Sequence, residues 1–152
     1  MEFMTAEQFL KEDKKVQEVI NNSIKLNIGD RIYHKLSKKY YIYLGEYNEG
    51  FWNVFDLEYK CTRVVCKDCF CRCLCEGELR EFIENKANYK ISCDIEEYGY
   101  QITLYKFNEG NRGEEHKVDY YRHFSPMDLK TCNLLQAYWK VTVQITKEIV
   151  NK

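Results

Sequence analysis

Short runs of alternating apolar and polar residues fill the middle of the chain and are separated by turn residues. Between positions 26 and 75 these runs are rich in aromatic and β-branched side chains, which favour strands. Gly50 can adopt the positive φ that a tight hairpin turn requires. The pattern predicts a β-meander with strands at 28–35, 40–46, 51–58, 62–66 and 69–74.

Helical spacing of apolar residues precedes this region and follows it. Thr5 and Gln8 match a capping box. In this motif the Thr5 hydroxyl accepts a hydrogen bond from the backbone N–H of Gln8, and the Gln8 side chain accepts one from the backbone N–H of Thr5. We therefore expect an N-terminal helix over 5–21, whose apolar face needs a partner. A second, shorter helix is expected over 78–88.

The last third of the chain combines strands with a further helix. Residues 90–124 alternate around Gly99 and resume after the glycine-bearing loop 108–113, which predicts a three-stranded antiparallel unit. Ser125 followed by Pro126 is typical of a helix start, so a C-terminal helix is expected over 126–150. Residues 141–150 would suit a strand as well.

The segment IGDRIYHKLSKKYYIYLGEYNEGFWNVFDLEYKCTRVV resembles a small SH3-like barrel. Gly29-Asp30 would open its first strand, and a short hairpin precedes Phe51. The resemblance covers about a quarter of the chain and implies a small, partly open antiparallel barrel. SH3-like barrels bind peptides or nucleic acids or act as scaffolds, so the resemblance implies no single function and no particular binding residues. We expect one α+β domain over 1–152, with a helix at each end.

Charge and composition narrow the classes of partner. The net charge of -1, from 23 basic and 24 acidic side chains, creates no global field that would gather phosphates, which disfavours nucleic-acid binding. No run of about 18 apolar residues occurs, so no membrane span is expected, and eight cysteines without a signal peptide favour the cytoplasm. Abundant Lys, Asn, Ile, Tyr and Phe are typical of AT-rich codons, which points to a low-GC bacterium, its phage or a mobile element.

Six of the cysteines crowd between Cys61 and Cys75. Zinc needs four ligands in a tetrahedron, but only Cys66 and Cys69 form a C-x2-C pair. The other thiols alternate with Phe70, Arg72 and Leu74, as small buried side chains on a strand would. We favour a packed strand without a cofactor, while a zinc site that uses Cys66 and Cys69 stays open.

Signatures of catalysis are missing from the sequence. His34, His116 and His123 lie in segments away from the cysteine cluster, and His116 and His123 would point to opposite faces of one strand. Glycine-rich nucleotide loops and the zinc-protease and serine-hydrolase motifs are absent. We expect that the protein is not an enzyme.

Tyrosine is abundant, with thirteen in the chain, and exposed tyrosine and tryptophan are typical of protein interfaces. Alternation puts Tyr41 and Tyr43 on one strand face and Ile42 and Leu44 on the other. Because the aliphatic pair suits a core, we expect both tyrosines to point outward. The predicted binding residues are Tyr41, Tyr43, Tyr47 and Trp52.

These observations favour a non-enzymatic accessory or inhibitory protein that binds a protein partner through a tyrosine-rich sheet surface. The first alternative is a zinc-stabilised module that binds nucleic acid through Arg63, Lys67 and Arg72. The second alternative is a cysteine-dependent enzyme, which would need a thiol with a depressed pKa.

Overall fold

The computed structural model describes residues 2–107 and 118–152, with residues 107 and 118–121 described by their backbone, and its chain divides into two compact units. The N-terminal unit comprises Phe3–Leu74, and the C-terminal unit comprises Cys75–Lys152 with Glu2. Helices and antiparallel sheets are mixed, which confirms the α+β class. The prediction of one domain stays a prediction, because contact density does not measure cooperative unfolding.

Two helices begin the N-terminal unit, α1 (Ala6–Leu10) and α2 (Lys14–Ser23). The predicted capping box is present, since Thr5 Oγ1 accepts from Gln8 N and Gln8 Oε1 accepts from Thr5 N. The prediction of one continuous helix is wrong, because Asp13 starts a new helix by accepting a hydrogen bond of 2.8 Å from Lys15 N. Short polar side chains of this kind favour a cap over a helix interior.

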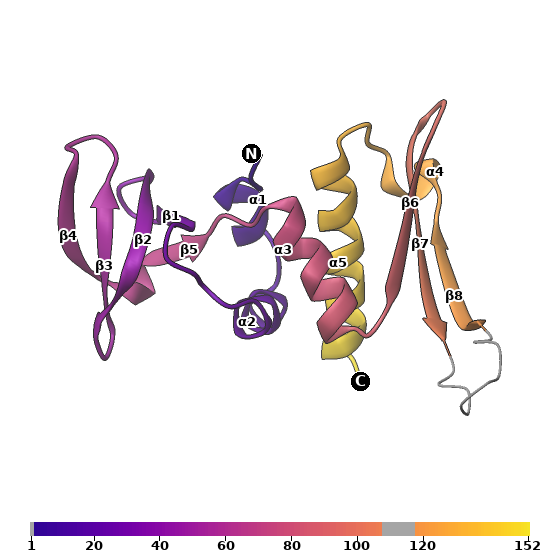
Figure 1. Ribbon diagram of the computed structural model, residues 1–152, viewed down its shortest axis with the longest axis horizontal. Coiled ribbons are helices and arrows are strands. Elements are labelled where there is room, and N and C mark those ends of the chain that lie inside the picture. Colours follow the sequence, from indigo (N-terminus) through magenta and orange to yellow (C-terminus); the bar gives the residue numbers. More distant parts are fainter. Residues whose placement is uncertain (1, 108–117) are drawn as a thin grey trace. The chain divides into compact units, whose positions relative to one another are not determined.

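Five antiparallel strands follow, as the sequence predicts, in the order β4-β3-β2-β1-β5 (Figure 1). Their bounds are β1 (Arg31–His34), β2 (Lys39–Asn48), β3 (Phe51–Asp56), β4 (Cys61–Cys66) and β5 (Phe70–Arg72). The last strand is shorter than predicted because a turn of 3-10 helix, η1 (Lys67–Cys69), precedes it. In the part of the chain that the structure describes, β4 and β5 are edges, so the sheet is open; its SH3-like character stays a prediction.

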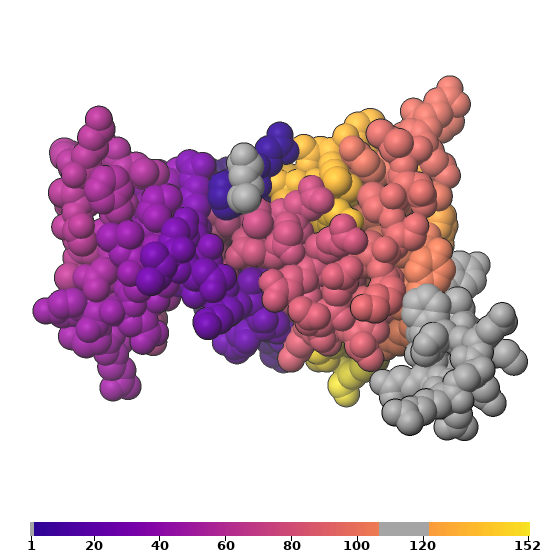
Figure 2. All heavy atoms as spheres, viewed as in Figure 1, coloured from indigo at the N-terminus to yellow at the C-terminus, as the bar shows by residue number. Residues whose placement is uncertain are grey.

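The C-terminal unit contains α3 (Glu76–Glu81), the π-helical turn η2 (Phe82–Lys86) and the predicted three-stranded antiparallel sheet. Its strands are β6 (Lys90–Glu96), β7 (Gly99–Phe107) and β8 (Val118–Phe124), and the β6–β7 hairpin projects from the surface (Figure 2). Both α3 and η2 pack against the long C-terminal helix, which also lies against β7.

The predicted C-terminal helix is two helices, α4 (Pro126–Leu129) and α5 (Leu134–Val150). Ser125 caps α4 as predicted, but Lys130 is left-handed with φ 48° and ends it. Asn133 then starts α5 by accepting a hydrogen bond of 2.9 Å from Gln136 N. Residues 141–150 are helical, which decides between the two possibilities that the sequence leaves open.

Gly99 is the glycine whose replacement we expect to damage the C-terminal unit. Its φ is +131°, and a Cβ there would lie 2.7 Å from the backbone oxygen of Thr131. Gly50 offers a matched control, because its φ is +87° but a Cβ would meet nothing within 4 Å. We expect Gly50→Ala to cost about 1 kcal/mol and Gly99→Ala about 3 kcal/mol in denaturant unfolding. Equal losses would contradict the close contact with Thr131.

Candidate functional site

A pocket of about 620 Å³ opens in the N-terminal unit between α2 and the sheet. Its size lies in the range of ligand sites, about 300–1,000 Å³. Apolar side chains from the segment after α2 and from β3 and β5 line it, and charged side chains surround them. The lining includes Ile24, Leu26, Lys35, Trp52, Lys67 and Phe70.

Trp52 and Phe70 belong to a cluster of aromatic rings on the inner face of the five-stranded sheet. The ring centroids of Trp52 and Tyr43 are 5.1 Å apart in an edge-to-face arrangement, and those of Phe70 and Tyr41 are 5.4 Å apart. Such pairs add stability beyond the area that they bury. Trp52 is only half-buried, so its indole is held in place by neighbours and still faces the pocket.

Arg72 fixes the wall of the pocket beside β5. Its side chain is buried, with Nη1 donating to the carbonyl of Ile24 and Nη2 donating over 2.9 Å to the carbonyl of Lys25. Asp30 Oδ2 lies 3.6 Å from Nη2 and supplies an opposite charge. A buried charge is tolerated only with such partners, and here they hold the segment after α2 against the strand.

The expected exposure of Tyr41 and Tyr43 is wrong, because their exposed fractions are only 8% and 7%. Tyr41 lies opposite Ile32 in β1, and Tyr43 lies opposite Val54 in β3, so both rings join a core cluster. Ile42 and Leu44, which were expected inside, occupy the other face and are half-buried. Both faces of β2 are apolar, so alternation separates two sets of side chains without showing which set is inside.

The other two predicted binding residues lie apart. Tyr47 is 60% exposed and sits at an irregularity of the β2–β3 ladder, while Trp52 lines the pocket. The structure therefore brings Trp52 together with Tyr43 but leaves Tyr47 near the hairpin end. Phe70 and Leu26 were missed as parts of a site, and Arg72 was considered only for binding nucleic acid, because their contacts join segments that are distant in sequence.

The six cysteines between Cys61 and Cys75 are only partly buried, and because β5 is shorter than predicted, only Cys71 of Cys69, Cys71, Cys73 and Cys75 lies in it. Cys71 and Cys73 are buried, whereas Cys66, Cys69 and Cys75 are half-buried, and all eight cysteines are thiols. Among the residues that the structure describes, no group of three or more His, Cys, Asp or Glu side chains is placed to hold a metal ion. Burial raises the pKa of Cys71, which lines the pocket, to about 11.

The basic residues of the nucleic-acid alternative do not form one surface. Arg72 is buried, and the guanidinium of Arg63 lies against Asp56, with 3.0 Å between Nε and Oδ2. Of these three residues, only Lys67 is both exposed and part of the pocket lining. A phosphate-binding surface would need accessible cations side by side.

The two histidines that the structure describes, His34 and His123, have different hydrogen-bond partners. His34 Nδ1 lies 2.7 Å from Ser37 Oγ and accepts a hydrogen bond of 3.0 Å from Ser37 N. His123 Nδ1 lies 3.1 Å from Thr103 Oγ1, and His116 is outside the described residues.

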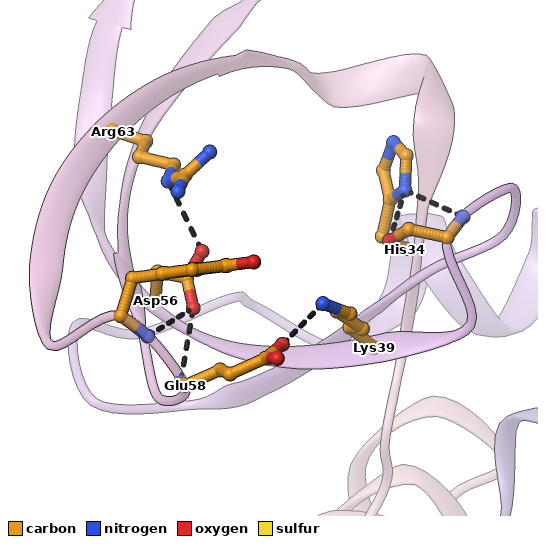
Figure 3. Close-up of polar contacts among 7 residues, drawn as sticks. His34, Lys39, Asp56, Glu58 and Arg63 are labelled. Atoms are coloured by element: carbon orange, nitrogen blue, oxygen red, sulfur yellow. Dashed lines mark hydrogen bonds and ion pairs between the residues drawn. The ribbon is translucent and has the colours of Figure 1, made fainter.

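Asp56 anchors a polar group at the turn between β3 and β4 (Figure 3). It is 2% exposed, and Oδ1 accepts hydrogen bonds of 3.0 and 3.1 Å from the N–H groups of Glu58 and Tyr59. Its Oδ2 has an ion pair with Arg63 that lacks hydrogen-bond geometry. Burial alone would raise the pKa of Asp56, but the two N–H groups and the charges of Arg63 and Lys39 outweigh it and lower the pKa.

Comparisons with protein-family models, with curated proteins and with solved structures find no match to this chain. In the described part of the chain, no helix has both the length and the apolar character that crossing a membrane requires.

The buried thiol of Cys71 should react slowly. With a pKa of about 11, fewer than about one in a thousand Cys71 side chains would be thiolate at pH 7.5, and the thiolate is the nucleophile. We expect iodoacetamide to label the exposed Cys61 and Cys132 well before Cys71, as followed by peptide mass spectrometry. Labelling in denaturant is the control, and equal native rates would show that Cys71 is accessible.

The lowered pKa of Asp56 predicts how its contribution to stability depends on pH. The unfolded chain, with an aspartate pKa of about 3.9, binds the proton more readily than the folded chain. The stabilisation is therefore present above that value and is lost as the pH falls through the lower folded pKa. We expect Asp56→Asn to lower the melting temperature at pH 7, and the gap from the wild type to close as the pH falls to 3.

The matched control for Asp56 is Glu49→Gln, which changes an exposed carboxylate in the β2–β3 turn. It should leave the melting curve nearly unchanged over the same pH range. A gap between Asp56→Asn and the wild type that stays constant with pH would refute the assignment.

Proposed function

We propose that the protein is a non-enzymatic accessory or inhibitory protein that binds a protein partner through the pocket of its N-terminal unit. The observation that carries the proposal is Trp52, which is half-buried among aromatic rings and faces a pocket of about 620 Å³. A partner would insert an apolar side chain against Trp52 and Phe70.

The energetics of interfaces support this role for Trp52. Tryptophan is enriched among the residues that dominate binding energy, particularly in pockets that exclude water. The contacts of its ring with Tyr43 and Phe70 hold it before a partner arrives, so little side-chain entropy remains to be lost on binding. Lys35 and Lys67 at the rim offer polar contacts that would orient the ligand.

The proposed binding surface differs from the tyrosine-rich sheet surface that the sequence predicts. Tyr41 and Tyr43 would act from the core by supporting Trp52 and Phe70, and Tyr47 would contact a partner at the hairpin end. The phage or mobile-element origin and the cytoplasmic location rest on composition and cysteine usage.

Removing the indole tests the proposal. The probe is a random peptide library displayed on phage, selected against the immobilised full chain. We expect wild-type protein to enrich peptides with a large apolar residue, and Trp52→Ala to weaken the selected peptides at least about 30-fold, the effect of losing about 2 kcal/mol. Affinities would be measured by calorimetry.

Two further variants keep the test valid if Trp52→Ala loses stability. Lys67→Glu reverses an exposed charge at the pocket rim, and Lys60→Glu reverses an exposed charge that does not line the pocket. Only Lys67→Glu should change peptide affinity. Binding that is indifferent to both Trp52 and Lys67 would refute the pocket as the binding site.

A further inference from the structure

The outer edge of β4 is the second feature of the N-terminal unit that can bind a protein chain. β4 pairs with β3 on one side, and in the described residues no strand pairs with it on the other (Figure 1). Its first four residues, Cys61–Val64, are exposed, and the strand contains no proline. Such an edge is a template for pairing with another chain unless charge, proline or a bulge protects it.

The backbone groups that face outward can be assigned from the ladder. Lys67 N donates to Gly50 O over 3.0 Å, which makes Gly50 and Lys67 a hydrogen-bonded pair of the β3–β4 ladder. Antiparallel pairs alternate, so residues 61, 63 and 65 also bond toward β3. The N–H and C=O groups of Thr62 and Val64 and the N–H of Cys66 therefore point away from the sheet.

We propose that the β4 edge binds the β4 edge of a second copy of this chain, antiparallel and around a two-fold axis at Val64. The interface is isologous, so the same residues serve both partners. The two five-stranded sheets become one continuous sheet.

The positions of the outward groups restrict the register. Residues with outward backbone groups must lie opposite each other, which leaves two registers that pair five residues of each strand. One places Arg63 directly opposite Arg63 of the second copy, and like charges in that position are destabilising. The other places Val64 opposite Val64 and Thr62 opposite Cys66, with Arg63 opposite Val65. Charge therefore selects the valine-centred register.

The pairing is confined to β4 itself, because Lys60 is left-handed with φ 51° and Lys67–Cys69 form the 3-10 turn η1. The net charge of -1 adds no strong repulsion between copies.

The apolar surface beside the edge gives the pairing more than backbone hydrogen bonds. Val64 is 48% exposed, and Phe51, which lies opposite Cys66 in the ladder, is 44% exposed. A second copy would cover part of both. An edge of this length forms an interface at the small end of the size range, so the dimer should be reversible and dependent on concentration.

Sedimentation of the full chain tests the proposal. We expect the wild type to form a reversible dimer at protein concentrations of roughly 10–500 μM, as weak complexes do. Val64→Pro removes only an N–H that faces outward, which edge strands tolerate, and should leave a monomer with little change in melting temperature. Val64→Lys places two lysines opposite each other and should also give a monomer, while Val64→Thr, the matched control, should still dimerise.

The possible results distinguish a dimer that pairs through the β4 edge from one that contacts through the pocket. A wild type that is monomeric over the whole range overturns the proposal, as does a Val64→Pro dimer as tight as the wild type. Trp52→Ala should dimerise normally, because the edge does not use the pocket. Dimerisation lost with Trp52→Ala but kept with Val64→Pro would assign the contact between copies to the pocket and overturn the proposed edge pairing.

Discussion

The N-terminal unit depends on the packing of Phe70 against rings from three other strands. Its ring centroid lies 4.8 Å from that of His34, 5.4 Å from that of Tyr41 and 6.3 Å from that of Trp52. β5 has only three residues, so its hydrogen bonds to β1 are few, and side-chain packing must hold it in place. Arg72, on the same face of this strand, ties it to the carbonyls of Ile24 and Lys25. Both residues line the pocket, so the contacts that hold β5 in place also form part of the pocket wall.

The strands could be predicted from the sequence, but the inner face of the sheet could not. Aromatic and β-branched residues in short runs mark β1 to β4 within a few residues. Tyr41 and Ile42 are both suited to a core, and their orientation depends on Ile32 and Val54 in neighbouring strands. A local pattern does not contain that information. The helix breaks were predictable in principle, since Asp13 and Asn133 are ordinary caps.

The burial of Arg72 shows why the candidate site was harder to predict than the fold. In the sequence, Arg72 alternates with Cys71 and Cys73, so the thiols would be assigned to the core and the guanidinium to solvent. The strand is buried on both faces, with Arg72 only 7% exposed. The carbonyls that satisfy its charge belong to residues 48 and 47 positions earlier in the chain. Only the folded arrangement reveals them.

The proposed pocket and the proposed edge are adjacent without competing for the same groups. Val65 lies opposite Trp52, and its side chain packs against the aromatic cluster, whereas the backbone of Val64 faces the edge. A strand added to β4 extends the sheet in its own plane and leaves the inner face open. The proposed dimer would therefore present two pockets at once. A partner with two matching segments could then gain affinity of about 10²–10⁴-fold over a single contact, provided that its linker spans both pockets.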